Sequence, residues 1–263
     1  MPKGPLVYRQ RLITRITHWV WAVSLFFLML TGLQIFNAHP SLHIGKEAGF
    51  QYDNAILESG ARQDGDTLVG VSALFGAEFD TTGVLGVSNG EPRAIPAALT
   101  IPSYQSLATG RAIHFFFAWA LVGTLALWLA ASALNGHFRQ LLPTLSDLRE
   151  LPRDIADHAR LRFHHGASYG VLQKLAYASI LFLALPLMIL TGLTMSPGAN
   201  AAAPWLLELF QGRQTARTIH FLTMLALIAF FAVHMAMILL AGPLNEMRSI
   251  LTGWYRTDGE KDV

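Results

Sequence analysis

Residues 217–241 read RTIHFLTMLALIAFFAVHMAMILLA, and this stretch decides the fold. From Thr218 to Ala241 it contains no Asp, Glu, Lys or Arg, and about 20 apolar helical residues suffice to cross a bilayer. Two histidines, His220 and His234, lie 14 residues apart within it. A buried helix of a soluble domain seldom stays uncharged over this length. The stretch therefore predicts a membrane-spanning helix that carries two ionisable rings.

Three other uncharged apolar stretches share this composition, and they cover residues 16–36, 112–134 and 175–195. The whole chain agrees with them, because 52% of its residues are hydrophobic and only 14% are charged, whereas soluble domains carry roughly 25% charged residues. We therefore expect an all-α membrane protein, a four-transmembrane-helix bundle that forms a single domain over residues 1–263. We expect the outer surface of this bundle to contact membrane lipid.

The basic residues predict how the spans are oriented. The two tails and the connection between the second and third spans face one side, and they carry Lys3, Arg9, Arg11, Arg15, Arg139, Arg149, Arg153, Arg160, Arg162, Lys174, Arg248, Arg256 and Lys261. The opposite face carries only Lys46, Arg62, Arg93, Arg111, Arg213 and Arg217. Both termini are therefore expected in the cytoplasm, with the protein in the cell inner membrane. The basic residues therefore indicate the orientation of the spans and do not indicate nucleic-acid binding. With a net charge of only +2, no nucleic-acid partner is expected.

Residues 37–111 form an extracytoplasmic insertion between the first two spans. They include eight acidic and four basic side chains, ten glycines and four prolines. A connection of this length is usually functional. We expect a long irregular loop, in which the part from Gly83 to Pro102 is turn-rich with short strands at most. Two interpretations stay open: a lid that covers the helix ends, or a docking platform for a soluble redox partner.

Four of the ten histidines lie inside the predicted spans, where ionisable residues are costly and mark functional sites. By depth, His114 and His220 form an outer pair, and His18 and His234 form an inner pair. The 14 residues between His220 and His234 correspond to about 21 Å of helix and return to nearly the same face. The other six are expected in solvated or interfacial loops: His39, His43, His137, His158, His164 and His165.

Two cross-helix histidine pairs at different depths suit two haems, each with two axial imidazoles, in a helical bundle. A zinc site would require about four converging ligands. A proton relay normally includes Asp or Glu within the spans, and these spans contain none. The chain has no cysteine, which excludes covalent C-x-x-C-H haem attachment, iron–sulfur clusters and disulfides. Non-covalent haem b is the expected cofactor.

An arginine precedes three of these histidines by three residues: Arg15 before His18, Arg111 before His114 and Arg217 before His220. Residues at i and i+3 share a helix face. The guanidinium groups can therefore pair with haem propionates, which are carboxylates. The alternative is that these arginines only anchor the helices at the membrane interface.

The chain also contains a faint internal repeat. Leu-Thr-Gly-Leu closes the first span at residues 30–33 and the third span at residues 190–193, and each copy is followed, after a loop, by Arg-x-x-His. The chain thus resembles two helical hairpins of shared plan. Gly32 and Gly192 are expected to stop their helices, since glycine is common just after a helix end.

These motifs resemble the bacterial cytochrome b561 type. The resemblance rests on Arg-x-x-His-Trp at 15–19, Leu-Thr-Gly-Leu at 30–33, Gly-Arg-x-x-His-Phe at 110–115 and the histidines 14 residues apart in the last span. That group includes the b-type cytochrome subunits of nickel–iron hydrogenase, formate dehydrogenase and thiosulfate reductase. It implies a di-haem b membrane anchor, with the same four histidines as ligands, that passes electrons between the quinone pool and a partner.

Residues 83–119 also resemble members that serve extracytoplasmic molybdopterin oxidoreductases. The long 37–111 segment differs from the hydrogenase and formate dehydrogenase subunits, so their partners are not carried over. Family analogy suggests a quinone pocket beside the inner haem. The polar candidates there are Asn135, His137, His164 and His165, although an ordinary loop residue is the favoured interpretation of each.

The leading hypothesis is transmembrane electron transfer between quinone and an extracytoplasmic redox subunit, possibly a molybdopterin oxidoreductase, docked on 37–111. One alternative is a free-standing membrane oxidoreductase acting on superoxide or ferric iron. A transporter with histidine-lined sites would require polar mid-membrane residues and broken helices, which the spans hardly show. A bare membrane anchor leaves the paired histidines unexplained.

Overall fold

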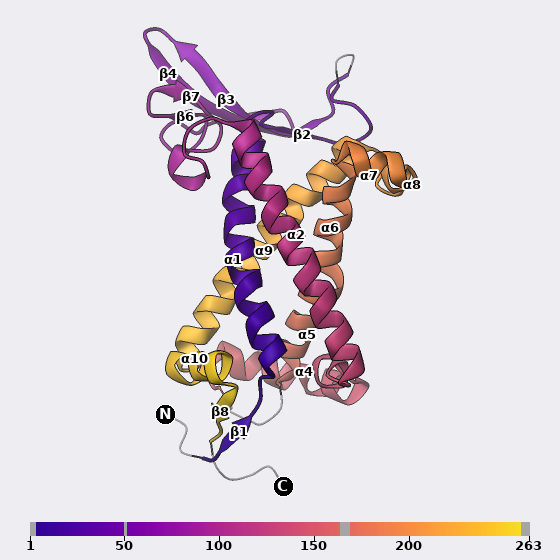
Figure 1. Ribbon diagram of the computed structural model, residues 1–263. Coiled ribbons are helices and arrows are strands. Elements are labelled where there is room, and N and C mark those ends of the chain that lie inside the picture. Colours follow the sequence, from indigo (N-terminus) through magenta and orange to yellow (C-terminus); the bar gives the residue numbers. More distant parts are fainter. Residues whose placement is uncertain (1–3, 50–51, 164–168, 259–263) are drawn as a thin grey trace. The chain divides into compact units, whose positions relative to one another are not determined.

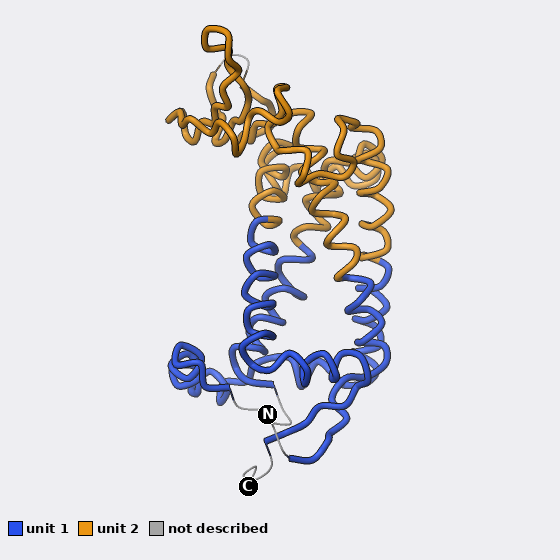
Figure 2. The backbone as a smooth tube through the Cα atoms, turned by 90° about the vertical axis from the view of Figure 1, so that its left-hand side faces the viewer, with its two compact units in different colours: residues 1–21, 123–186, 225–263 blue, residues 22–122, 187–224 orange. Residues whose placement is uncertain are grey.

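The computed structural model describes residues 4–49, 52–163 and 169–258 (Figure 1). The chain divides into two compact units (Figure 2). Unit 1 comprises residues 1–21, 123–186 and 225–263, and unit 2 comprises residues 22–122 and 187–224. Each long helix contributes one part to each unit. The two units are therefore described separately.

The described residues contain four helices that are long and apolar enough to cross a membrane. They are α1 (Leu12–Phe36), α2 (Leu107–Leu134), a third span over Val171–Thr194 and α9 (Arg213–Ala241). Their mean hydropathy lies between 1.8 and 2.5. The four predicted spans are confirmed as helices.

Each helix begins four or five residues earlier than the uncharged stretch that predicted it. Charged side chains such as Arg15, Arg111 and Lys174 end the uncharged run, but Arg and Lys are good helix formers. Their long apolar stems also lie well along a helix while the charged group reaches a polar environment. The helices therefore continue past the limit that charge alone suggests.

The third span is interrupted by a π-helical segment. It consists of α5 (Val171–Ser179), the π-helical η2 (Ile180–Ala184) and α6 (Leu185–Thr194). Pro186 lacks a backbone N–H and clashes with the carbonyl four residues before it in a regular helix, here that of Phe182. Phe182 lies in the π-helical segment. The wider turn thus gives the proline a place without ending the helix.

The segment between α1 and α2 is not the irregular loop that the sequence predicted. It contains an antiparallel sheet of four strands in the order β2 (Ser41–His43), β3 (Ala55–Asp64), β4 (Thr67–Leu74) and β5 (Ala77–Asp80) (Figure 1). A small hairpin of β6 (Val87–Ser88) and β7 (Glu91–Pro92) and the 3₁₀ turn η1 (Ala97–Leu99) follow. The all-α prediction is therefore corrected to a mostly helical protein with sheets.

Glycines explain why the sheet was missed. A Cβ atom on Gly86 would lie 2.2 Å from the Gly60 carbonyl oxygen, and one on Gly70 would lie 2.1 Å from the Leu85 carbonyl oxygen. The 83–86 turn therefore packs directly on the backbone of β3 and β4, where no side chain fits. Glycine is normally a sign against a strand and marks close backbone approach when it occurs in one. The hydrophobic pattern alone therefore predicts turns, and no sheet, in this segment.

Within unit 2 the sheet is anchored on the helices. Phe36 of α1, Leu42 of β2 and Ile95 form one buried cluster, and Phe221 of α9 packs against it. The side chain of Asn37 completes the junction, because it accepts from the Ile95 N–H (2.7 Å) and donates to the Ile95 carbonyl (3.1 Å). These contacts fix the segment to the ends of α1 and α9.

Unit 1 joins the tails and the connection between α2 and α5. Strand β1 (Leu6–Tyr8) pairs with β8 (Trp254–Arg256), which ties the two ends of the chain together. The shorter helices are α3 (Phe138–Leu141), α4 (Leu145–Ala159) and α10 (Pro243–Thr252) in unit 1, and α7 (Pro197–Ala202) and α8 (Trp205–Leu209) in unit 2.

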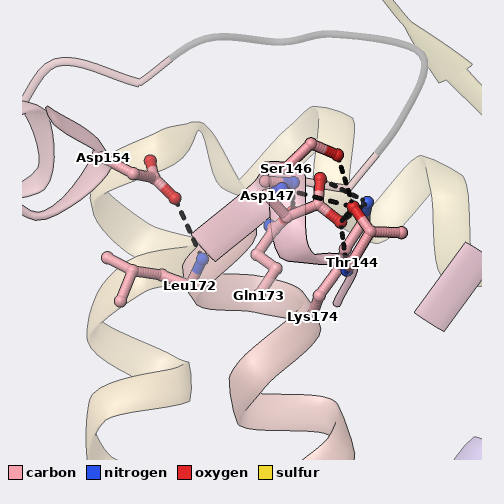
Figure 3. A network of polar contacts seen from close by, with 8 residues as sticks. Thr144, Ser146, Asp147, Asp154, Leu172, Gln173 and Lys174 are labelled. Carbon is pink, nitrogen blue, oxygen red and sulfur yellow. Dashed lines mark hydrogen bonds and ion pairs between the residues drawn. The ribbon is translucent and has the colours of Figure 1, made fainter. Parts of the chain in front are cut away.

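A polar network binds α4 to α5 (Figure 3). The Thr144 hydroxyl accepts from the Asp147 N–H (3.2 Å), and the Asp147 carboxylate accepts from the Thr144 N–H (2.7 Å), which forms a capping box. Lys174 of α5 donates to both oxygens of the same carboxylate at 3.0 and 2.9 Å. Asp154 accepts from the Leu172 N–H at the start of α5 (2.9 Å). The carboxylates of α4 therefore hold the first turn of α5.

Candidate functional site

Each unit holds one of the predicted histidine pairs. The outer pair, His114 on α2 and His220 on α9, lies in unit 2, and the two rings are close enough to interact electrostatically. The inner pair, His18 on α1 and His234 on α9, lies in unit 1. All four rings are half-buried. The structure thus brings together the partners that helical depth predicts.

The outer rings are held by two threonines. The Nδ1 atom of His114 lies 3.0 Å from the Thr31 hydroxyl on α1, and the Nδ1 atom of His220 lies 3.0 Å from the Thr191 hydroxyl on α6. Both threonines are completely buried. The two contacts are copies of one arrangement, since each threonine belongs to one Leu-Thr-Gly-Leu repeat.

The hydroxyl protons are already used within their own helices. Thr31 donates to the Phe27 carbonyl at 2.6 Å, and Thr191 donates to the Leu187 carbonyl at 2.6 Å. Each hydroxyl oxygen can therefore only accept from the ring, which assigns the ring proton to Nδ1. The Nε2 nitrogen of each ring keeps its lone pair, which is the form of imidazole that binds a metal.

The glycine after each threonine lies against the ring, and the contact is tight only at Gly192. A Cβ atom on Gly32 would lie 3.5 Å from Cε1 of His114, and a Cβ atom on Gly192 would lie 3.3 Å from Cε1 of His220. The helices α1 and α6 continue to Phe36 and Thr194. The expectation that these glycines stop their helices is therefore wrong, and their role is close packing against the imidazoles.

The inner rings face each other without such partners. The ring centroids of His18 and His234 are 6.5 Å apart, with 53° between the ring planes. Metal–imidazole bonds of about 2.0–2.1 Å, with each ring centroid about 1.1 Å beyond its nitrogen, would separate two axial rings by about 6.3 Å. The observed spacing fits two axial ligands of one metal. His18 Nδ1 is buried and has no hydrogen-bond partner within the described residues.

Neither pair fits a site that requires more ligands. Across residues 4–49, 52–163 and 169–258, no group of three or more His, Asp or Glu side chains is arranged to hold a metal ion. A haem needs only two axial protein ligands because its macrocycle supplies the other four. The residues present therefore fit haem b.

The three predicted arginines contact the protein in different ways. Arg217 donates to the carbonyls of Ser41 (2.7 Å) and His39, and Arg15 donates to the Leu251 carbonyl. Arg111 lies with its guanidinium 5.5 Å from the centre of the Phe115 ring. The pairing of these arginines with propionates stays a prediction.

Two of the loop histidines are buried, which corrects the expectation that all six are solvated or interfacial. His43 is 7% exposed and contacts Asn54 and Ser41, and His137 is 5% exposed and contacts Gln140. Burial lowers the pKa of His137, and nearby Arg11 lowers it further.

The remaining quinone candidates differ in what the structure describes. Asn135 is exposed after the end of α2, and His137 lies with its ring centroid 6.1 Å from that of Trp128 in unit 1. His164 and His165 lie outside the described residues. Their role in a quinone site stays a prediction.

Sequence reasoning missed Thr31 and Thr191 as parts of the site. The repeated Leu-Thr-Gly-Leu was visible, but it was interpreted through its glycine alone. The signal that could have identified the threonines is depth, because each repeat lies near the same end of its span as the outer histidine that follows it in the chain.

Four apolar spans with paired half-buried imidazoles define the class of protein: a membrane cytochrome with non-covalent haem. The chain matches the family described as prokaryotic cytochrome b561 over residues 9–253. It belongs to this family and is a multi-pass, b-type haem membrane protein of electron transport. It is also 25% identical over 232 residues to the "Putative protein-methionine-sulfoxide reductase subunit YedZ1" of Azospira oryzae, covering 86% of this chain and 87% of that protein.

Proposed function

We propose that this protein is a di-haem subunit that transfers electrons between the quinone pool and an extracytoplasmic redox partner. His114 and His220 hold the outer haem, and His18 and His234 hold the inner haem. The observation that carries the proposal is the presence of one pair of neighbouring imidazoles in each unit. When bound, haem b supplies one-electron chemistry through its iron.

The residues around the outer pair orient the ligands. Thr31 and Thr191 hold the ring protons on Nδ1, and the missing side chain of Gly192 lets the His220 ring lie against α6. The apolar surfaces of the spans keep water away from this position. Arg15, Arg111 and Arg217, one turn from their histidines, are the proposed propionate partners.

The sheet between α1 and α2 is the proposed docking surface for the partner. Its edge strand β5 is exposed throughout, and the neighbouring Phe75, Phe79 and Val84 are 75%, 54% and 68% exposed. Exposed aromatic and apolar side chains of this kind are enriched at protein interfaces. The relative in Azospira oryzae is named as a reductase subunit, which supports an extracytoplasmic oxidoreductase as partner, of the molybdopterin class that the sequence suggests.

We place the protein in the cell inner membrane with both termini in the cytoplasm. This orientation follows from the basic residues, most of which lie in the tails and in the connection between the second and third spans. Quinone would then exchange protons and electrons near the inner pair, with Asn135 and His137 as the polar candidates that the structure describes.

Haem counting tests the proposal. Purified wild-type protein should bind two haems per chain, His220→Ala should lose only the outer haem, and His234→Ala should lose only the inner haem. His158→Gln is a matched control, because His158 contacts Asp154 on α4 and belongs to neither pair. Two haems should remain in this control. A colourless wild-type protein, a single haem, or loss of both haems from folded His220→Ala would refute the proposal.

A further inference from the structure

We propose that Thr31 and Thr191 are positioning residues that orient the outer ligands and set the electron-donating strength of their Nε2 nitrogens. This inference rests on the proposed function, because it concerns how the chain treats the haem that His114 and His220 would share. It assigns a role to residues on α1 and α6, and α6 supplies no ligand itself.

The first step is the direction of the hydrogen bonds. Each threonine hydroxyl has its proton committed to a carbonyl of its own helix, so the ring must donate from Nδ1. The hydroxyl oxygens of Thr31 and Thr191 are therefore acceptors for the rings of His114 and His220. The tautomer is thereby fixed with Nε2 free.

The second step is the effect on the ligand. Donation from Nδ1–H increases the basicity of a ligating imidazole and fixes the orientation of its ring. A more basic imidazole favours ferric over ferrous iron. Each ring of the outer pair has a threonine acceptor at Nδ1, so the two increases in ligand basicity would act on the same haem and add. Removing the hydroxyls should therefore raise the reduction potential of that haem.

The third step is the contrast with the inner pair. His18 Nδ1 is buried without a hydrogen-bond partner in the part of the chain that the structure describes. The chain thus treats its two pairs differently. The outer haem alone should respond to changes at Thr31 and Thr191, which makes the inner haem an internal reference.

The variants Thr31→Val and Thr191→Val remove the hydroxyls while keeping branched side chains, and Thr31→Ser and Thr191→Ser keep the hydroxyls. Thr223→Val is the matched control. Thr223 lies on α9 and donates to the Ile219 carbonyl (2.8 Å), as Thr31 and Thr191 donate to carbonyls of their own helices, but no histidine ring of the described residues bonds to its oxygen. Redox titration and low-temperature EPR of the ferric protein are the measurements. His220→Ala identifies which signal belongs to the outer haem.

Each valine variant should raise the potential of the outer haem, shift its EPR g-values and speed haem transfer to apomyoglobin by roughly 10- to 100-fold, the range typical for loss of such a partner. The serine variants and Thr223→Val should behave like wild type. If a valine variant loses the outer haem outright, retention in the serine variant supports the inference.

Two outcomes would overturn it: an unshifted outer haem in the double valine variant, or identical behaviour of the serine and valine variants. Failure of the proposed function looks different, because the wild-type protein would then lack two bis-histidine haems before any threonine is changed.

Discussion

Arg93 should hold the sheet between α1 and α2 in place, and its removal provides a quantitative test. The side chain is 8% exposed, and its guanidinium donates to the Ile95 carbonyl (3.1 Å), the Gln34 side chain (2.9 Å), the Ser103 carbonyl and the Thr100 hydroxyl. Gln34 belongs to α1, so one group links the helix end with the chain that follows the sheet. Burial lowers the pKa of Arg93.

The magnitude follows from these four hydrogen bonds. Hydrogen bonds to a charged group contribute about 1.5–3 kcal/mol each, but they share one guanidinium whose burial is itself costly. Leaving a buried acceptor unsatisfied costs about 1–3 kcal/mol, and with four acceptors that relax in part the total loss should be about 3–5 kcal/mol. We expect Arg93→Met to destabilise the segment by that amount. Arg62→Met is the matched control, because Arg62 pairs with Glu78 at 3.0 Å on the exposed surface and is worth about 0–1 kcal/mol.

Hydrogen exchange of the β3 and β4 amides measures this difference in lipid nanodiscs. At 1.4 kcal/mol for each factor of ten, Arg93→Met should accelerate exchange by about two to four powers of ten, and Arg62→Met by less than about one. Equal exchange rates in the two variants would refute the reasoning, because they would show that the four buried hydrogen bonds contribute no more than an exposed ion pair.

Two further predictions concern the glycines and the α4 network. Gly32→Ala should keep the outer haem and stabilise α1 by about 0.5–1 kcal/mol, since its Cβ makes ordinary contact with His114, whereas Gly192→Ala should displace the His220 ring and broaden the haem spectrum. Equal spectra would contradict this distinction. Hydrogen bonds from the Thr144 backbone, then from Lys174, lower the pKa of Asp147 from 3.8 to about 2. Because the pKa is depressed in the folded state, this stabilisation is present above about pH 4 and is lost as the pH falls towards 2. Thermal unfolding of Asp147→Asn should lack that part of the acid dependence, and an unchanged pH profile would count against it.

The helices could be predicted because the relevant signal is local composition, which can be read from the sequence without knowledge of the fold. Uncharged runs of apolar residues identified all four spans and their ends at Phe36 and Leu134. The starts were missed by one turn, since residues such as Arg111 are compatible with both helix and interface. The π-helical segment before Pro186 is a local response to one residue, and periodicity does not reveal it.

The sheet could not be predicted because the features that build it oppose the usual strand signals. Gly70 and Gly86 are required by backbone contacts between segments that are distant in sequence. The turn between β4 and β5 places Phe75 at φ 50° and Gly76 at φ 79°, and only Gly76 signals such a turn.

The candidate site could also be predicted only in part. Helical depth predicted which histidines lie near each other, whereas the contacts of the threonines depend on side-chain directions across two helices. Thr31 and Thr191 look like ordinary small residues of a membrane helix until the structure places their hydroxyls beside Nδ1.

The turn between β3 and β4 has a practical consequence for studying this protein. Asp64 pairs with Thr67 across that turn, Asp66 is exposed, and a Cβ atom on Gly65 would contact nothing within 4 Å. The chain contains no cysteine. The substitution Asp66→Cys would therefore introduce a single thiol into the chain. A maleimide dye or spin label attached to it would report from the tip of the sheet, and no other cysteine would need to be removed first.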